Sequence, residues 1–521
     1  MEYILQEAIS SLTLRAEKMD SEVLCETFVD VGSLLTLLCS NNNHVLFGRR
    51  GTGKTHILEY LRNKLEQQGH CAVYLDLRTI GSIQSIYQDS SIPLQQRAAR
   101  MMIDVAEAIN LSLSKFVMSD DVRAKKLSPV IEPVLHEINE KIRTINIEGQ
   151  VVSKEVDEKV SKTSSGTCLG LGINKAYLNA DIKNDNQCKS TQSIVREGRE
   201  RVYIHFPSIS QLYGQIVDVL DGKRLIFIID EFSELPGVLQ PYLADMLRRS
   251  FIAIRGVNIK IDAIEHRTKL RVFQNAGSVA SYIGLEIGAD CSSCNLDEYM
   301  VFNNNKNHSL QFFGELLRKH INKELPPERR LTDQGEVVHR LFSNQNAFEE
   351  WVRSAEGVPR DALNILGLAI QIDVSNKISL SSLRKAANGW YNKDKEQAVS
   401  CYQKAKDLLY WIIDTVIGNR QSRAFLLNSS NNDALINYLY DSRVLHIIKT
   451  NVSGRDEPGV RYNVYAIDYG CYCNLINTKN NPKCLFQAEA DDGGEIDVEV
   501  PADDYRSIRR AILKLDEFYT A

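Results

Sequence analysis

Short apolar runs alternate with stretches of helical periodicity along residues 1–300. The runs HVLF, CAVYLDL and LIFII are strand-sized, and their mainly apolar composition is typical of strands buried on both faces of a parallel sheet. Two further strands are predicted at 257–270 and 282–288. The segment after HVLF repeats apolar side chains at helical spacing, at Ile57, Leu58, Leu61 and Leu65. Strands that alternate with helices predict an open parallel α/β sheet, with ligands at the carboxyl ends of the strands.

The pattern changes twice in the second half of the chain. Residues 305–395 carry several stretches with apolar side chains at i, i+3 and i+4, which predict a mainly helical region. Residues 400–475 read as a helix, a short strand, a second helix and a hairpin around SGRDEPG, which is a winged-helix plan. The chain ends in the acidic stretch AEADDGGEIDVEVPADD and a terminal segment that favours a helix.

A glycine-rich sequence joins the first strand to the first helix. It fits the phosphate-loop pattern G-x-x-x-x-G-K-[ST] at every fixed position, as Gly48-Arg49-Arg50-Gly51-Thr52-Gly53-Lys54-Thr55. The backbone N–H groups of such a loop and the helix N-terminus bind phosphate oxygens. Lys54 is predicted to reach the β- and γ-phosphates, and Thr55 to ligate Mg²⁺. The loop therefore predicts ATP and Mg²⁺ as cofactors.

Two acidic residues follow the apolar strand at 225–229. Asp230 is predicted to hold the Mg²⁺ shell, and Glu231 to orient and deprotonate the attacking water as a general base. Two acids that end a strand by accident are the alternative, and the phosphate loop upstream argues against it. The pair predicts hydrolysis of the γ-phosphate.

A third motif lies in GVPRDALNILGLAI, residues 357–370, where Gly-x-Pro-Arg opens a helix. After the phosphate loop and the acidic strand, this motif resembles sensor 2 of AAA+ ATPases. The whole order of motifs is similar to the origin-recognition/initiator branch of that family, prokaryotic type. The resemblance implies that Arg360 lies on a helical lid and reaches the γ-phosphate. The alternative is a surface helix that begins with Pro and exposes an Arg, which is common.

The resemblance implies two further roles, and this chain departs from the usual pattern at both. Initiators usually place a small polar residue, often Asn, after the third core strand, where this chain has Glu265-His266-Arg267. We expect His266 or Glu265 as the sensor-1 equivalent. An arginine finger for the nucleotide of a neighbouring subunit is expected from Arg271 or Arg267, with the pair in MLRRSF less well placed. Surface salt bridges are the alternative for these arginines.

The resemblance also implies a division into domains. Residues 1–300 would form the AAA+ α/β nucleotide-binding core, 301–398 a helical lid, 399–480 a winged-helix-like domain, and 481–521 the acidic tail and a terminal helix. The core is longer than this plan requires, and the excess, about 119–202, is predicted to be an inserted subdomain. It begins with helical spacing and continues in a Gly- and Asn-rich segment that favours a β-hairpin or short sheet. Long insertions usually carry recognition.

Charge bears on the choice of partners. The 521 residues carry a net charge of −5, which argues against strong sequence-blind nucleic-acid binding and still allows a local basic patch. The winged helix of initiators grips duplex DNA. In residues 399–480 basic residues only slightly outnumber acidic ones, so DNA and a protein partner are both open there. Assembly into a homo-oligomer is expected as well.

Composition is that of a soluble protein from a reducing compartment. The chain is 43% hydrophobic and has 11 scattered cysteines. Its N-terminus lacks the pattern of a secretory signal, and no run approaches the ~20 apolar residues of a membrane span. We therefore expect free thiols, a cytoplasmic location and no membrane. Cys291-Ser-Ser-Cys294 and Cys471-Tyr-Cys473 have poor spacing for a structural zinc site.

Together these observations predict an ATPase switch that acts on DNA or on a partner protein. The sequence offers no nuclease-like carboxylate cluster, no Ser-His-Asp order and no deaminase zinc signature, which favours a regulator over a stand-alone effector. Two processes stay open: the regulatory ATPase of a bacterial anti-phage defence system, and a DNA replication initiator or loader. The alternative from another class is an assembly scaffold that holds ATP or ADP and hydrolyses little.

Overall fold

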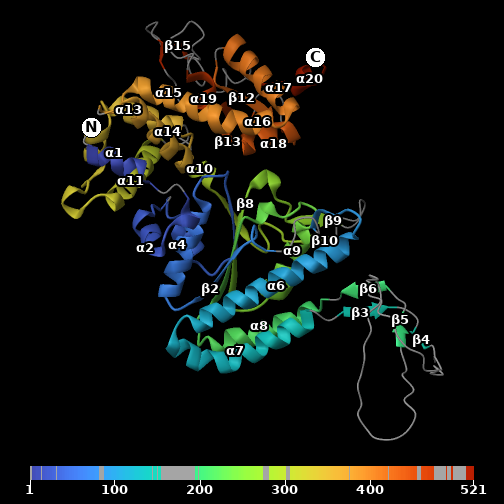
Figure 1. The fold of residues 1–521 in the computed structure, drawn as a ribbon. Helices are drawn as coiled ribbons and strands as arrows, with labels where there is room; N and C mark the ends of the chain where they lie inside the picture. Colours follow the sequence, from blue (N-terminus) through green and yellow to red (C-terminus); the bar gives the residue numbers. More distant parts are fainter. Residues whose placement is uncertain are drawn as a thin grey trace, which may run out of the picture.

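The computed structural model describes most of the chain: residues 3–12, 15–30, 32–80, 87–142, 145–148, 151–153, 194–196, 199–202, 204–273, 281–300, 306–374, 376–420, 422–453, 459–473, 488–489, 495–496 and 512–520. Figure 1 shows an α/β core, with a mainly helical region (yellow) and a C-terminal part (orange) on one side of it. Within the described ranges, every helix is too short or too polar to cross a lipid bilayer.

A five-stranded parallel sheet forms the centre of the core. Its order is β11-β1-β8-β7-β2, with the bounds Ser292–Asn295, His44–Phe47, Val257–Ala263, Leu225–Asp230 and Cys71–Asp76. Every neighbouring pair in this sheet is parallel. The predicted α/β phosphate-loop fold is therefore confirmed. The acidic strand β7 lies one strand away from β1, which leads into the phosphate loop, and β8 lies between them.

Helices cover both faces of the sheet, because successive side chains of a strand point to opposite faces. Leu46 of β1 packs in one core, with α4 (Lys54–Gln67) and the N-terminal helices α1 (Tyr3–Ser10), α2 (Ser21–Thr27) and α3 (Leu34–Leu38) near it. Val45 and Phe47 pack in the other core. That second core is covered by α6 (Leu94–Met118), α7 (Asp121–Ile142), α8 (Phe206–Val219) and α9 (Gln240–Leu247), as Figure 1 shows.

The last strand of the parallel sheet differs from the sequence prediction. The predicted strand at 282–288 is shorter, β10 (Tyr282–Gly284), and it pairs antiparallel with β9 (Arg271–Phe273) outside the main sheet. The fifth parallel strand is β11, which lies at the edge of the sheet and exposes two serines. Its residues SSCN lack the continuous apolar run that marks β1, β7 and β2.

The predicted insertion is described in part. Its first portion is helical, as its spacing predicts, and forms α7, which packs against α6 and α8. Beyond α7 the chain forms two antiparallel pairs, β3 (Ile145–Glu148) with β6 (Arg199–Val202) and β4 (Val151–Ser153) with β5 (Ile194–Arg196). The Gly- and Asn-rich segment predicted to form a hairpin or short sheet lies outside the described residues. The boundary of the insertion stays a prediction.

The region predicted to be helical contains α11 (Lys306–Glu324), α12 (Gln334–Leu341), α13 (Gln345–Ser354), α14 (Pro359–Ile372) and α15 (Leu380–Trp390). Its centre is Trp351, which is fully buried and lies against Phe313, Phe342 and Phe348. The indole N–H of Trp351 donates to Ala362 O at 2.8 Å and ties α13 to α14. The helix that carries Arg360 is thus fixed on a packed core.

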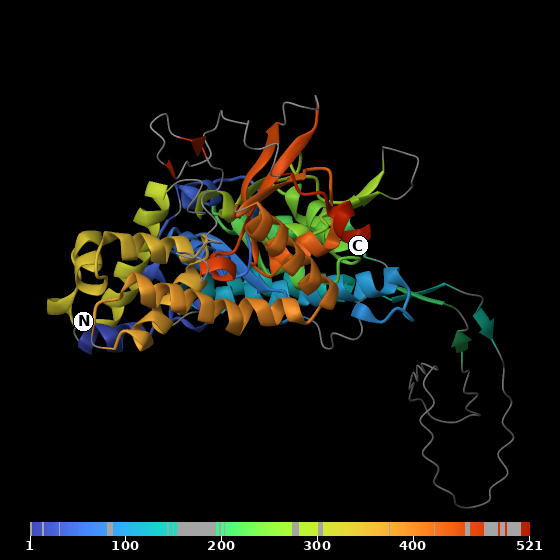
Figure 2. The same ribbon diagram turned by 90° about the horizontal axis from the view of Figure 1, so that it is seen from above.

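The C-terminal part has the predicted order of helix, strand, helix and hairpin. Its elements are α17 (Gln403–Ile412), the π-helical η7 (Ile413–Asn419), β12 (Ala424–Asn428), α18 (Ala434–Asp441), β13 (Leu445–Ser453) and β14 (Arg461–Ile467). The strands form one antiparallel sheet in the order β12-β14-β13. Seen from above in Figure 2, these elements overlie the core. Their assignment as a winged helix stays a prediction, and most of the acidic tail lies outside the described residues.

Short elements connect or extend these parts. They are η1 (Ala16–Lys18), η2 (Phe232–Glu234), η3 (Arg248–Ile252), η4 (Glu265–Arg267), α10 (Leu296–Met300), η5 (Pro327–Arg329), η6 (Tyr391–Lys395), α16 (Glu396–Ser400), α19 (Tyr469–Tyr472), β15 (Ala488–Glu489), β16 (Glu495–Ile496) and α20 (Leu515–Thr520). Of these, α10 contacts both β1 and β13, so it lies where the core meets the C-terminal part.

Candidate nucleotide-binding site

The phosphate loop runs from β1 to α4, and two of its glycines have left-handed backbone conformations. Gly51 and Gly53 have φ values of 88° and 94°, a conformation that residues with a side chain rarely adopt. A Cβ atom at Gly51 would also lie 2.9 Å from Arg360 Nε and 3.1 Å from Val358 Cγ1. The loop approaches the lid this closely because position 51 has no side chain.

Lys54 begins α4, and its ammonium group turns back into the loop. Nζ donates to Gly48 O at 2.9 Å and to Arg49 O at 3.2 Å, and it lies 3.5 Å from Asp262 Oδ1. Two of these three partners are neutral carbonyl oxygens. Hydrogen bonds from an ammonium group to phosphate are stronger than those to a neutral carbonyl. A phosphate group bound in the loop would therefore replace the carbonyl oxygens as partners of Lys54.

A group of buried polar side chains surrounds the end of β7. Tyr74 donates a hydrogen bond to Asp230, and the side chains of Thr55 and Asp262 lie beside it. Burial alone would favour its protonated form, but these three neighbours and Lys54 hold the pKa of Asp230 below its usual value. Burial and the nearby Asp230 raise the pKa of Asp262 well above its usual value, against the effect of Lys54. Asp230 is therefore the ionised member of the pair, beside the hydroxyl of Thr55.

Glu231 has a backbone conformation that is uncommon for a residue with a side chain. Its φ of 55° lies in the left-handed region. Its N–H is held by Asp230 Oδ1 at 2.9 Å and by Asp262 Oδ2 at 3.4 Å. Its carboxylate lines the cavity, with Arg78 NH1 at 3.7 Å from Oε1. Burial raises the pKa of Glu231 above its usual value, although Lys54 opposes this, and a raised pKa suits a general base.

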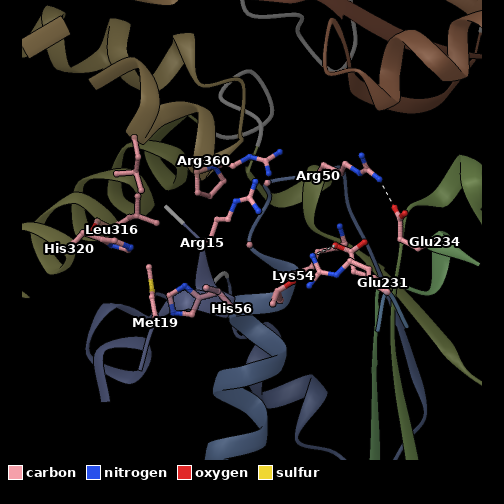
Figure 3. A pocket seen from close by; sticks show the side chains of 17 residues that line it. Arg15, Met19, Arg50, Lys54, His56, Glu231, Glu234, Leu316, His320 and Arg360 are labelled. Carbon is pink, nitrogen blue, oxygen red and sulfur yellow. Dashed lines mark hydrogen bonds and ion pairs between the residues drawn. The ribbon is translucent and has the colours of Figure 1, made fainter. Parts of the chain in front are cut away.

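A cavity of about 330 Å³ is lined by residues of the phosphate loop, by Glu231 and by Arg360, as Figure 3 shows. Its charged end has five cationic side chains and two carboxylates: Arg15, Arg50, Lys54, Arg78, Arg360, Glu231 and Glu234. This excess of positive charge suits a polyphosphate. The other end is less polar and is lined by Met19, His56, Leu316, His320 and Leu363. Burial lowers the pKa of both histidines, that of His320 to about 4, so this end is uncharged at neutral pH.

Arg360 enters the cavity from the N-terminus of the lid helix α14. Its backbone N–H donates to Gly51 O at 3.3 Å, so the loop and the lid are in direct contact. Burial lowers the pKa of Arg360, and the nearby Arg443 acts in the same direction. Among the described residues, its guanidinium has no ion-pair partner within 4 Å. A half-buried cation of this kind is a suitable ligand for a phosphate oxygen.

The structure brings some of the predicted site residues together and places others elsewhere. Glu231, Lys54 and Arg360 line one cavity, whereas His266 packs edge-on against Tyr440 at 5.0 Å between ring centroids. Arg271 lies on β9, outside the cavity, and pairs with Glu286. A finger that acts on a neighbouring subunit is not expected in its own cavity, so the role of Arg271 stays a prediction, and so does that of His266.

Two other predicted candidates and one loop residue also point away from the cavity. Glu265 Oε2 accepts a hydrogen bond from Asn295 at 3.0 Å, and Arg267 pairs with Asp441 at 2.7 Å. Arg49 was predicted as a nucleotide contact within the loop, but its side chain is fully buried outside the cavity lining, against α10 and the C-terminal part.

Sequence reasoning missed several residues of the site. Asp262 is one of two charged residues, with Lys260, in a strand that is buried along its whole length, and charge inside a central strand is a signal that could have marked it. Arg78 follows the carboxyl end of β2, where ligands of parallel sheets bind, so the same rule that found Asp230 could have found it. Arg15 and Met19 come from an N-terminal segment whose sequence carries no comparable signal.

The residues present fit ATP and Mg²⁺. The left-handed glycines make a concave loop, the cavity holds an excess of cations, and the uncharged end suits an aromatic base. Thr55 lies beside Asp230, and a hydroxyl with an ionised carboxylate is a donor pair that Mg²⁺ accepts.

One comparison with known proteins supports the resemblance found in the sequence, over a short stretch. The ORC-CDC6-like family model matches residues 11–72, which include the phosphate loop and Arg15, so the resemblance to origin-recognition AAA+ ATPases is confirmed over that stretch. Among solved structures, the Aeropyrum pernix ORC1 protein in complex with DNA is 12% identical, with a TM-score of 0.30, over 88% of this chain and 96% of that chain. A TM-score this low does not establish a shared arrangement. The comparison with curated proteins gives no match.

Proposed function

We propose that this protein is a switch of the AAA+ type that binds ATP with Mg²⁺ and hydrolyses it. The observation that carries the proposal is the one cavity in which the phosphate loop, Glu231 and Arg360 meet, although they come from three distant parts of the sequence. A phosphate-binding loop alone supports binding. A carboxylate with a raised pKa, and a guanidinium that has no ion-pair partner in the described part of the chain, support hydrolysis at the same cavity as well.

Each residue has its own role in this proposal. Lys54 and the loop N–H groups bind the β- and γ-phosphates, and Thr55 with Asp230 holds Mg²⁺, which when bound neutralises phosphate charge. Glu231 accepts a proton from the attacking water. Arg360 stabilises the charge that develops on the transferred group and links it to the position of the lid.

Replacing Arg360 with alanine is expected to lower turnover by about 10²–10³-fold, because one preorganised donor to the developing charge is lost. ATP affinity should fall less, since the loop and Lys54 remain. Phosphate release under saturating ATP, together with equilibrium binding, separates the two effects. Arg340→Ala is the matched control, because Arg340 lies on α12 of the same helical region, outside the cavity, and pairs with Glu336. Wild-type turnover by Arg360→Ala would contradict the assigned role.

A nucleotide-bound assembly scaffold is the second candidate, and one observation favours it. Arg78 lies 3.7 Å from the Glu231 carboxylate, and a nearby cation opposes the acceptance of a proton. Such a pair would make hydrolysis slow until something displaces Arg78. The enzyme and the scaffold differ in whether removal of the Glu231 carboxylate changes phosphate release.

The process in which the switch acts is the finer part of the proposal. In a winged helix, α18 would be the helix that enters a major groove. Here its C-terminal end is turned toward the core and lid, where Tyr440 donates to Asp297, Asp441 pairs with Arg267, and Arg443 just after it pairs with Asp361. This docked helix fits a regulator that contacts a protein partner, such as the ATPase of an anti-phage system, and a DNA-binding initiator would have to release it.

Binding of duplex DNA is the measurement that separates these processes. We expect weak, salt-dependent binding, with Kd about 10⁻⁴–10⁻⁶ M at physiological salt, as for binding through phosphates alone. Fluorescence anisotropy with and without ATP, at low and high salt, measures it. Removal of Arg461, exposed on β14, should weaken binding, whereas removal of Arg329, in the helical region, should not. Tight, nucleotide-dependent binding would favour the initiator, whereas weak binding that ATP does not change, or no binding at low salt, would favour the protein partner.

Self-association belongs to the same proposal. The Arg271 side chain is 43% exposed on β9, where a second copy can reach it. If Arg271 is the arginine finger, turnover should depend on protein concentration, because the finger completes the site of a neighbouring subunit.

A further inference from the structure

A buried arginine joins the phosphate loop to the C-terminal part. Arg49 Nε donates to Asp297 Oδ1 of α10 at 2.8 Å, and NH2 donates to Glu356 O at 3.2 Å. NH1 donates to His446 Nδ1 of β13. The guanidinium also lies 5.3 Å from the ring centroid of Tyr440 in α18. The loop is thus held at once by α10, by the segment that leads into the lid helix and by the C-terminal part.

Asp297 and Tyr440 complete this contact. Asp297 Oδ2 accepts from the backbone N–H of Arg49 at 3.0 Å and from the Tyr440 hydroxyl at 3.0 Å. Burial opposes ionisation of Asp297, but Arg49 and these hydrogen bonds hold its pKa below its usual value. A carboxylate and a guanidinium that are both buried are stable only while their remaining hydrogen bonds are made. The Tyr440 hydroxyl therefore takes part in fixing the loop.

A second buried group lies behind Arg360. The next residue, Asp361, is fully buried and pairs with Lys395 at 3.1 Å and with Arg443. Lys395, also buried, pairs with Asp468 at 2.5 Å. The start of the lid helix is therefore tied to the same C-terminal part that holds Arg49.

His446 connects the two groups. Because its Nδ1 accepts from Arg49, its proton lies on Nε2, which donates to Asp468 Oδ1 at 3.0 Å. Burial and the facing Arg49 lower the pKa of His446 to about 4, so the ring is neutral at pH 7. The contacts run without a break from Arg49 through His446, Asp468 and Lys395 to Asp361. They join Arg49, a residue of the phosphate loop, to Asp361, the residue that follows Arg360.

We propose that His446 and Tyr440 are positioning residues of the nucleotide site, and that through them the C-terminal part responds to the nucleotide. This inference rests on the proposed function, because it requires a nucleotide in the cavity. If the loop shifts, Arg49 moves with it. Its partners must then move as well, because a buried charge is stable only while its hydrogen bonds are made. If a partner binds by displacing α18, it changes the affinity for nucleotide by the same factor by which nucleotide changes the affinity for that partner.

Two variants of one residue test the connection. His446→Leu removes both hydrogen bonds of the ring, whereas His446→Gln keeps an acceptor for Arg49 and a donor for Asp468. Equilibrium binding of a non-hydrolysable ATP analogue is measured together with amide exchange in 434–441 and 445–453. Wild type and His446→Gln should show a nucleotide-dependent change of exchange in both segments. His446→Leu should lose this change and bind the analogue about 5- to 150-fold more weakly.

The control and the outcomes separate this inference from the proposed function. Asp407→Asn changes an exposed carboxylate on α17 of the same C-terminal part, which accepts a hydrogen bond from Gln403 and does not touch Arg49, and it should leave both readouts unchanged. If His446→Leu does not fold, Tyr440→Phe replaces it, since it removes only the hydroxyl that donates to Asp297, and a smaller loss in both readouts is expected. A folded variant with wild-type affinity and a wild-type exchange response would overturn the inference. A wild-type protein that binds no analogue would overturn the proposed function instead, and the coupling with it.

Discussion

Replacing Glu231 with glutamine is expected to lower ATP turnover by about 10²–10⁴-fold, the usual contribution of a general base. Glutamine has nearly the same shape but cannot accept the proton of the attacking water. The backbone bonds from Glu231 N–H to Asp230 and Asp262 do not involve the side chain, so the local turn should persist. ATP affinity should change little, because Lys54 and the loop carry the binding. Single-turnover phosphate release and equilibrium binding measure the two quantities.

The comparison with wild type also decides between enzyme and scaffold. Equal, background-level release by wild type and by Glu231→Gln would mean that the carboxylate does no chemistry, which leaves the scaffold. Glu315→Gln is a suitable control, because Glu315 lies on α11 in a partly exposed pair with Arg318, outside the cavity. Loss of release in that variant as well would point to a general effect on folding.

Replacing Lys54 with alanine is expected to weaken ATP binding by about 2–5 kcal/mol, a factor of about 30 to 4,000. The reason is that Lys54 is buried, lines the cavity and begins the helix to which the loop leads. Isothermal titration calorimetry with ATP and Mg²⁺ gives the affinity directly. The enzyme and the scaffold both require this loss, so it tests binding and is independent of hydrolysis.

The control for this variant lies on the same helix. Lys64→Ala removes a cation from the last turn of α4, away from the loop, and should bind ATP as wild type does. Melting temperatures of both variants show whether the loop still folds, since Lys54 also donates to two carbonyl oxygens of the loop. Wild-type affinity in Lys54→Ala would remove the phosphate-binding role of the loop.

The central strands and the motifs on them could be predicted because their signals are local. β1, α4 and β7 are marked by apolar runs, helical spacing and a loop pattern within a few residues of each other. The edge strand β11 could not be found in this way, since its residues SSCN carry no apolar run. Its position is fixed by pairing with β1, a contact between residues nearly 250 positions apart.

The candidate site shows the same limit. Lys54, Asp230, Glu231 and Arg360 each sit in a motif, so the sequence could place them before the structure did. Arg49 looks like an ordinary loop residue, and nothing near it in the sequence indicates that it is buried against His446. Contacts of this kind depend on where separate parts of the chain dock, and no periodicity records that.

The left-handed backbone at Glu231 has a consequence for how stable this protein can be. A non-glycine residue in that conformation costs of order 1–3 kcal/mol, which the surrounding structure has to supply. Glycine would relieve the strain and remove the carboxylate at the same step. At this strand end, the substitution that would most readily stabilise the fold is also one that would silence the proposed reaction, so stability and activity oppose each other at a single residue.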